Sequence, residues 1–144
     1  MLVNFDAPSR DECVADRIKS NSPQQALTLL NDPTFVEAAR AMAIRIQKTS
    51  ADDTFESILD RGFLLAVGRS ANGTEKEGLQ KVFTDQIARY RSQPEEAQQL
   101  NKNGNMKTPA NPSKEDQAEA GAQLAAWTQV CRVILNLHET ITRY

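Results

Sequence analysis

The side chains best suited to acid–base chemistry meet where His138 precedes Glu139, near the end of the sequence. His138 is the single histidine, and a histidine beside a carboxylate is a common pair for moving protons in enzymes. Consecutive residues of a helix point in different directions, so this spacing does not aim both side chains at one substrate atom. A histidine near a helix end also fits the local backbone charge. We therefore interpret His138 as a structural or surface residue and predict no catalytic residue.

The two cysteines, Cys13 and Cys131, are far apart in the sequence and form neither a C-x-x-C nor a C-x-x-C-H motif. Two buried thiols or one disulfide both fit, and the largely apolar run 130–135 around Cys131 favours buried thiols. No two of the Cys and His residues have the spacing of zinc ligands, and neither thiol has a positioned base. The glycines form no phosphate-binding loop. We expect no metal and no cofactor in this chain.

The charge balance argues against nucleic acid as a partner. The chain has 17 Lys and Arg residues against 19 Asp and Glu residues, and its basic residues form no concentrated patch. The longest apolar runs are far too short to span a bilayer. Residues 1–6 lack the basic start and long apolar stretch of a signal peptide, so the localisation stays open.

Helix starts are clearly marked in the first part of the chain. Ser22 and Gln25 have the spacing of a capping box, and Pro23 between them suits the first helical position. Asp32 and Pro33 end this helix and begin the next, because an Asp caps well and a Pro presets the φ angle. We expect a helix–helix corner at these residues.

Further helices are marked by apolar residues at helical spacing and by capping pairs at 53–56 and 74–77. The predicted helices after the corner are 33–48, a helix from about 53 that ends near Gly68, 74–92 and 94–100. Residues 101–113 are polar and contain two prolines, so we predict an exposed loop there.

The last helix, from about 113, is predicted to be the centre of the fold. Its apolar residues keep helical spacing and occupy nearly all sides, which is typical of a helix buried within a bundle. We expect Trp127 to pack in this core rather than to stack on a sugar ring or a base. The apolar set is Leu124, Trp127, Val130, Cys131, Val133, Ile134, Leu135, Leu137 and Ile141.

These features predict an all-α fold, an irregular bundle of about five or six helices around the apolar C-terminal helix. With 144 residues, of which 40% are hydrophobic and 25% charged, the chain suits a single globular domain, 1–144. No repeat of fixed period is apparent, so a solenoid is disfavoured.

Polar residues stand out at both ends of the sequence. Segment 4–21 lacks apolar periodicity, so we expect it to fold by lying against something else, with Phe5 as an anchor. Two interpretations stay open: these groups are surface or linking residues, or they face a groove or a neighbouring domain. The candidate interface or ligand-facing residues are Asp6, Arg10, Arg17, Asn21, Asn31, Asp32, Asn136 and Arg143.

A long ordered string of motifs resembles a known family, strongly at both ends of the chain and loosely between residues 70 and 125. The stretches that carry the likeness are Phe5–Arg10, Cys13, Asn21–Leu27, Leu29–Pro33, Phe35–Arg40, Leu64–Arg69, Ala126–Thr128, Arg132–Leu137 and Glu139–Arg143. Together they resemble the C-terminal domain of unknown function of the large planctomycete cytochrome-c-associated proteins.

The resemblance implies a long, exported parent protein in which a haem-binding c-type cytochrome segment and a second domain precede this one. It also implies a link to polysaccharide degradation, with genes often beside sulfatases. This chain has no C-x-x-C-H motif, so haem c is expected only in the parent. Because the family's motif starts upstream of Met1, we expect the chain to be the C-terminal fragment of a larger multidomain protein.

Three hypotheses about function follow from the sequence. The leading one is a non-catalytic helical module whose partners are sister domains of the same polypeptide. The runner-up is a contribution to an enzyme or glycan-binding site that a missing sister domain completes, with a polysaccharide as the ligand. The third, prompted by the strongly apolar last helix, is a stand-alone protein that oligomerises.

Overall fold

Regular structure in the described part of the chain is helical. The computed structural model describes residues 22–50, 52, 54–102 and 114–141, with side chains described from 117 onward in the last of these ranges. The helices are α1 (Pro23–Asn31), α2 (Pro33–Thr49), α3 (Phe55–Ala66), α4 (Gly73–Ser92), α5 (Pro94–Asn101), α6 (Lys114–Leu135) and α7 (His138–Ile141). The predicted all-α class is confirmed for these residues.

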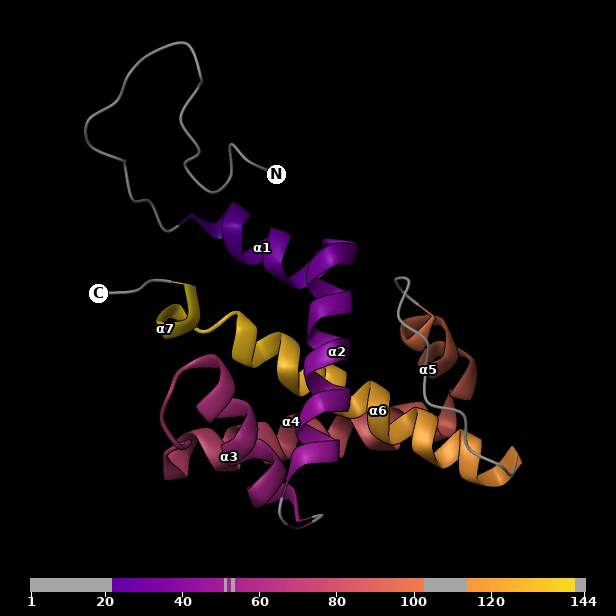
Figure 1. The fold of residues 1–144 in the computed structure, drawn as a ribbon. Coiled ribbons are helices and arrows are strands. Elements are labelled where there is room, and N and C mark those ends of the chain that lie inside the picture. Colours follow the sequence, from indigo (N-terminus) through magenta and orange to yellow (C-terminus); the bar gives the residue numbers. More distant parts are fainter. Residues whose placement is uncertain (1–21, 51, 53, 103–113, 142–144) are drawn as a thin grey trace, which may run out of the picture.

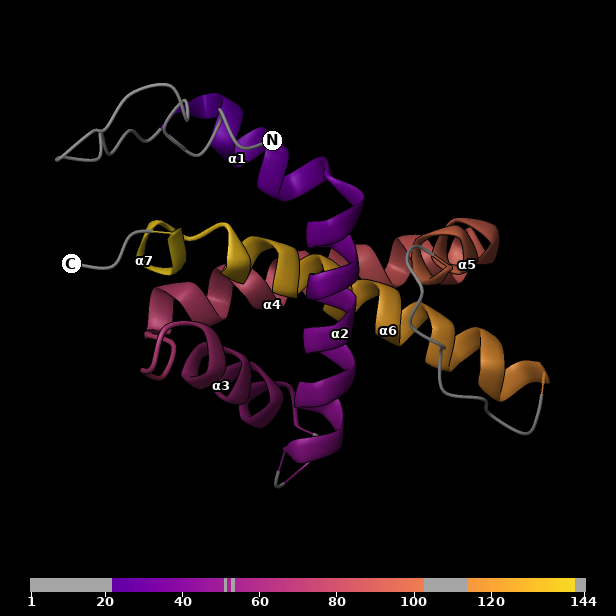
Figure 2. The ribbon, with the colours of Figure 1, turned by 45° about the horizontal axis from the view of Figure 1, so that its top comes forward.

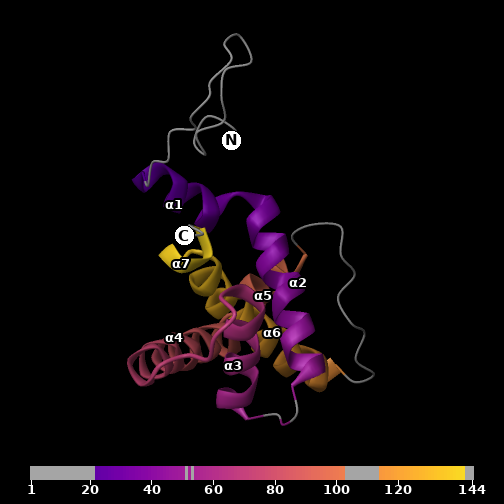
Figure 3. The same cartoon turned by 60° about the vertical axis from the view of Figure 1, so that its left-hand side comes forward.

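Helix α6 lies at the centre of the bundle, as its apolar sequence predicts. It contacts each of the other described helices. Helix α2 crosses it, α4 lies along it, α5 packs toward its beginning, and α1 and α7 lie toward its end (Figures 1 and 2). A turned view shows α1 and α7 on the same side of the bundle (Figure 3). The fold therefore gathers the first and last described helices around one end of α6.

The corner between α1 and α2 forms as the sequence predicts. The Gln25 N–H donates to Ser22 Oγ at 3.3 Å, and the Ser22 N–H donates to Gln25 Oε1 at 3.2 Å, which completes a capping box. Asp32 caps α2, because its Oδ1 accepts from the Thr34 N–H at 2.9 Å. Each cap satisfies a helix-end donor that the helix itself leaves without a partner, which contributes about 1 kcal/mol.

Two later helices begin at other residues than predicted. Helix α4 begins after Asn72, whose Oδ1 accepts from the Glu75 N–H at 2.9 Å while Glu75 accepts from the Asn72 N–H at 2.8 Å. The predicted capping box at 74–77 was wrong, because an Asn caps at least as well as a Thr and this one lies two residues earlier. Helix α3 is capped by Thr54, one residue after the predicted Asp53.

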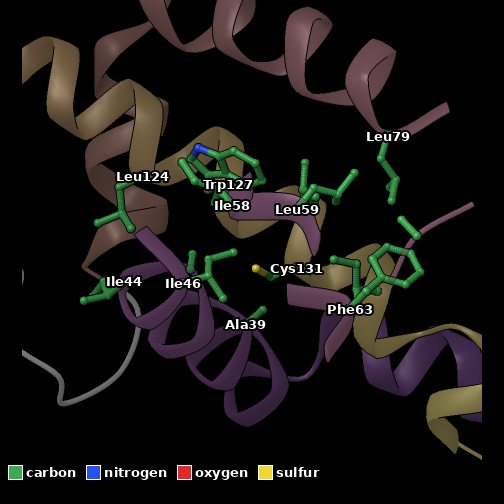
Figure 4. Close-up of a cluster of buried hydrophobic side chains, with 14 residues drawn as sticks. Ala39, Ile44, Ile46, Ile58, Leu59, Phe63, Leu79, Leu124, Trp127 and Cys131 are labelled. Atoms are coloured by element: carbon green, nitrogen blue, oxygen red, sulfur yellow. The ribbon is translucent and has the colours of Figure 1, made fainter. Parts of the chain in front are cut away.

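The main core lies where α2, α3 and α4 meet α6. Fully buried apolar side chains of α2, α3 and α6 fill this core, and Figure 4 shows several of them around the Cys131 thiol. Burial of each such side chain contributes about 1.5–3 kcal/mol relative to exposure. The largest apolar members are Phe63, Ile46, Leu59, Ile134 and Val130.

Three aromatic rings join α3, α4 and α6 beside this core. Trp127 is only 4% exposed, and its ring centroid lies 5.2 Å from that of Phe55 and 4.9 Å from that of Phe83. Ring pairs at this spacing contribute about 0.5–1.5 kcal/mol beyond the area that they bury. The core position predicted for Trp127 is confirmed.

The C-terminal helix is shorter than predicted. It was expected to continue through Ile141, but α6 ends at Leu135 and a turn precedes α7. In a continuous helix the Ile134 carbonyl would accept from the N–H four residues later. Here it accepts from the Leu137 N–H at 3.2 Å and from the Thr140 hydroxyl at 2.8 Å, which closes the helix.

The apolar stripe of α6 is also narrower than predicted, because Val133 is 36% exposed. The predicted loop 101–113 likewise needs a correction at its first residue. Asn101 is the last residue of α5 and is buried, and its side-chain amide donates to the Gly121 carbonyl of α6 at 2.9 Å. Residues 103–113 lie outside the described part of the chain.

Candidate functional site

Three of the predicted interface residues fall in the described part of the chain: Asn31, Asp32 and Asn136. For the others the expected role stays a prediction, because they lie outside the described residues. They are Asp6, Arg10, Arg17, Asn21 and Arg143.

Asn31 and Asp32 are used at helix ends. Asn31 is exposed, and its side-chain amide donates to the Leu27 carbonyl of the same helix at 2.9 Å. Asp32 is half-buried and holds the first turn of α2 through the Thr34 N–H. Both side chains therefore shape the corner between α1 and α2, and their hydrogen bonds are local to it.

Arg132 attaches the end of α1 to α6. Its guanidinium donates to the Leu30 carbonyl near the end of α1 and, at 2.7 Å, to Gln129 Oε1 on its own helix. The Gln129 amide in turn donates to the Tyr90 hydroxyl of α4 at 2.7 Å. One row of hydrogen bonds thus runs from α4 across α6 to α1. Two neighbouring segments form what we call the α1–α6 corner. They are the second half of α1, with Leu27 and Leu30, and the last turns of α6, with Arg132 and Val133.

Asn136 follows Arg132 by about one helical turn and lies where α6 ends. Its side-chain oxygen is buried and accepts no hydrogen bond from the described residues. Asn136 and the Asn31–Asp32 pair are thus gathered at the same end of α6, joined through Arg132. No direct hydrogen bond links them among the described residues.

Apolar side chains are exposed on both helices of the α1–α6 corner. Leu27 on α1 is 58% exposed and Val133 on α6 is 36% exposed. Leu64 on α3, at 48%, is the other large apolar side chain with such exposure in the described part of the chain. Single exposed leucines are ordinary on protein surfaces, so their position beside the predicted polar residues is what singles out the first two.

A second polar cluster joins the connection between α3 and α4 to α7. Arg69 donates two hydrogen bonds to Glu75 at 2.7 and 2.9 Å and two to Glu139 at 2.9 and 3.0 Å. Its hydrogen bonds lower the pKa of Glu75 to about 2 and also lower the pKa of Glu139. The two carboxylates in turn raise the pKa of Arg69. Beside this cluster, Asp60 accepts from Lys76 at 2.8 Å.

The His138–Glu139 pair lies at the start of α7, and its carboxylate bonds to Arg69. His138 is exposed and begins α7 instead of lying near the end of the last long helix. The neighbouring Glu139 carboxylate accepts from Arg69, which holds it ionised at neutral pH. The structural or surface role of the histidine stays a prediction.

Arg40 is a buried link that sequence reasoning missed. It lies on α2 with no exposed surface, and its guanidinium donates to the backbone carbonyl of Asn101 at the end of α5. Asn101 itself bonds to α6, so these two residues join three helices. The signal in the sequence was an arginine inside an apolar helix face, and Arg132 carries the same signal within the run 130–135.

Cys131 is a buried thiol, as the sequence favours. It has no exposed surface, it forms no disulfide, and desolvation raises its pKa well above the usual range. Since the thiolate is the reactive form, this burial keeps Cys131 inert. Cys13 lies outside the described residues.

One shallow hollow of about 480 Å³ lies beside α5 and is lined by Tyr90, Glu96, Gln99 and Leu100. Its carboxylate is engaged, because Glu96 pairs with Arg89 at 2.8 Å. Within the residues that the structure describes, no group of three or more His, Cys, Asp or Glu side chains is placed to hold a metal ion. The described helices also include none with the length and apolar character of a membrane span.

Three arginine side chains in the described part of the chain hold helices together. Arg132 bonds α1, Arg40 bonds α5, and Arg69 bonds both α4 and α7. Each contact is a hydrogen bond from a charged donor, which contributes more where it is buried, as for Arg40, than where it is partly exposed, as for Arg69.

Comparison with known proteins places the chain in a family. No curated protein and no solved structure matches it. Residues 1–83 match the PSD1 family model, described as a protein of unknown function (DUF1553). The matched region spans α1, α2, α3 and the beginning of α4. Because this match covers more than half of the 144 residues, the chain belongs to the PSD1 family of proteins of unknown function (DUF1553).

Proposed function

We propose that this chain is a non-catalytic helical module that works by docking against sister domains of a larger polypeptide. The observation that carries the proposal is that polar side chains of this chain form hydrogen bonds between its own helices and at a helix end. Arg40, Arg69 and Arg132 each bond across to another helix, and Asp32 caps one. Groups bound in this way fix the positions of the helices relative to one another, which supports a binding face of fixed shape.

The docking face that we propose is the α1–α6 corner. Leu27 offers the most exposed large apolar side chain among the described residues, and Val133 lies on the neighbouring helix. Covering one such side chain contributes about 1.5–3 kcal/mol to an interface. Asn31 lies one turn after Leu27 on α1 and, with the adjoining Asp32, suits the polar rim of an interface.

The occupant of this face is, in our proposal, a sister domain of the same polypeptide. The resemblance to planctomycete cytochrome-c-associated proteins supports this choice, because in those proteins other domains precede this one. By the same resemblance, the parent is exported and belongs to the machinery of polysaccharide degradation. Membership of the PSD1 family is consistent with the domain of unknown function in that arrangement.

Haem c does not fit this chain's own residues. Covalent attachment needs two accessible thiols with a histidine in a C-x-x-C-H motif, which the sequence lacks. The described thiol, Cys131, is fully buried in the core, and the single histidine, His138, is exposed on α7. Any haem of the parent is therefore held by another segment, and no step of the proposed function passes through it.

Replacing Leu27 in the full-length parent tests the docking face. Leu27→Glu places a charge at the centre of the proposed contact, so the module should detach more often. We expect limited proteolysis to release the module roughly tenfold faster than from the wild type.

The matched control is Leu64→Glu, because Leu64 is a similarly exposed leucine on α3, outside the α1–α6 corner. This variant should release the module at the wild-type rate. Equal release from both variants, or wild-type release from Leu27→Glu, would show that the corner is not where the module docks.

A further inference from the structure

One side chain, Arg69, ties helix α7 to the connection between α3 and α4. Arg69 lies in the connection between α3 and α4 and donates two hydrogen bonds to Glu139, 70 residues later in the chain. The same guanidinium donates two hydrogen bonds to Glu75 on α4. The Glu75 carboxylate also accepts a hydrogen bond from the Asn72 N–H at 2.8 Å, so this carboxylate holds the Arg69 guanidinium at the start of α4.

The described residues of α7 lie at the surface of the bundle. The helix has four residues, none of them buried, and a helix of this length has no stability of its own. The Thr140 hydroxyl donates to the Ile134 carbonyl at 2.8 Å, and Leu137, in the turn before α7, packs against the main core. Segments with few buried contacts open at low free-energy cost without unfolding of the whole domain.

We propose that Arg69 is an electrostatic latch that keeps α7 closed against the bundle, and that α7 opens separately when this latch is released. Closing holds the turn with Leu137 in place against the core, and opening frees it. This inference concerns a device within the fold and is independent of any sister domain.

The charge state of Glu139 decides whether the latch is closed. The charged groups that act on it are Arg69 from the α3–α4 connection, Glu75 from α4 and His138 from α7 itself. Arg69 lowers the Glu139 pKa below the ordinary value of 4.5, while the like charge of Glu75 opposes this. Glu139 is also the more exposed partner, at 53% against 22% for Glu75. Glu139 should therefore take up a proton before Glu75 does, and α7 should be released before α4.

The sign of the pH dependence follows from this lowered pKa. The latch is fully present at neutral pH, above the unfolded-state pKa of Glu139, and is lost as the pH falls through the folded-state pKa. High salt weakens it as well, since the pair is partly exposed.

Amide hydrogen exchange of the full chain at neutral pH tests the latch, with Glu139→Gln as the variant. The amides to follow are those of Thr140 and Ile141, which both donate to the Leu137 carbonyl. We expect them to exchange about two- to fivefold faster in the variant, the range for loss of one partly exposed ion pair. The Glu75 amide, which caps α4, should keep its wild-type rate.

Glu119→Gln is the matched control. It breaks the exposed pair between Arg91 of α4 and Glu119 of α6, which carries a similar charge at a different place. Exchange at Thr140 and Ile141 should then be unchanged. Unchanged exchange of these amides in Glu139→Gln, or equal acceleration in all helices, would overturn the latch.

Discussion

At the scale of single residues, arginine side chains act as cross-links between helices. Arg132 reaches the Leu30 carbonyl of α1, and Arg40 reaches the Asn101 carbonyl of α5. A carbonyl near a helix end has no partner within its own helix, so a guanidinium supplies one from outside. These two residues were not among the predicted site residues, because the helical spacing of apolar residues does not show which backbone carbonyl a charged side chain on that face reaches.

Removing the Arg132 guanidinium should therefore lower the free energy of unfolding by more than is usual for a partly exposed side chain. Arg132→Met keeps most of the side-chain volume but leaves the Leu30 carbonyl and Gln129 Oε1 without this donor. We expect the free energy of unfolding, measured by urea denaturation, to fall by about 1.5–3 kcal/mol.

The control is Arg91→Met, which removes an exposed arginine paired with Glu119. Exposed pairs contribute about 0–1 kcal/mol, so this variant should unfold close to the wild-type midpoint. Equal losses in the two variants would show that Arg132 does not link α1 to α6 in the way described.

At the scale of helices, the sequence predicted the class of fold and the starts of α1, α2 and α5, but it misplaced the caps of α3 and α4 and the end of α6. Capping side chains act within a few residues, so Ser22 and Asp32 could be recognised from local spacing. The end of α6 depends on the Thr140 hydroxyl reaching back to the Ile134 carbonyl, a contact that apolar periodicity does not reveal. The end of α3 was predictable, because Gly68 adopts a φ of 83° and its N–H donates to the Phe63 carbonyl.

Two glycine substitutions should change stability in opposite directions. Gly68→Ala forces a Cβ into the left-handed region and should destabilise the domain by about 1 kcal/mol. Gly78→Ala lies inside α4 with open space around the added methyl group, so it should stabilise by about 0.5–1 kcal/mol. Thermal denaturation measures both, and shifts of the same sign would contradict the assigned backbone geometry.

At the scale of the whole molecule, the family match and the fold cover different parts of the chain. The match ends at residue 83 within α4, while the central helix α6 lies beyond it. Side chains of α2 and α3, such as Ile46 and Phe63, share one core with residues of α6. The second half of the chain therefore completes the core of the matched half.

The contacts that assemble the candidate site could not be predicted from local sequence patterns. Arg132 and Leu30 are 102 residues apart, and Arg69 and Glu139 are 70 residues apart. Spacing along a helix says which residues share a face, but it does not say which distant helix covers that face. The sequence therefore predicted the central helix, whereas the structure shows that its last turns bond to α1 and that the α3–α4 connection bonds to α7.

The central claim is that this module acts as part of a longer polypeptide, and the size of the natural protein tests it most directly. An antibody raised against residues 22–141 would be applied to exported and internal fractions of cells that naturally produce the protein. We predict an immunoblot band in the exported fraction well above 16.0 kDa, the mass of this chain. A band at 16.0 kDa alone would contradict the account, because no sister domain would then be available for docking.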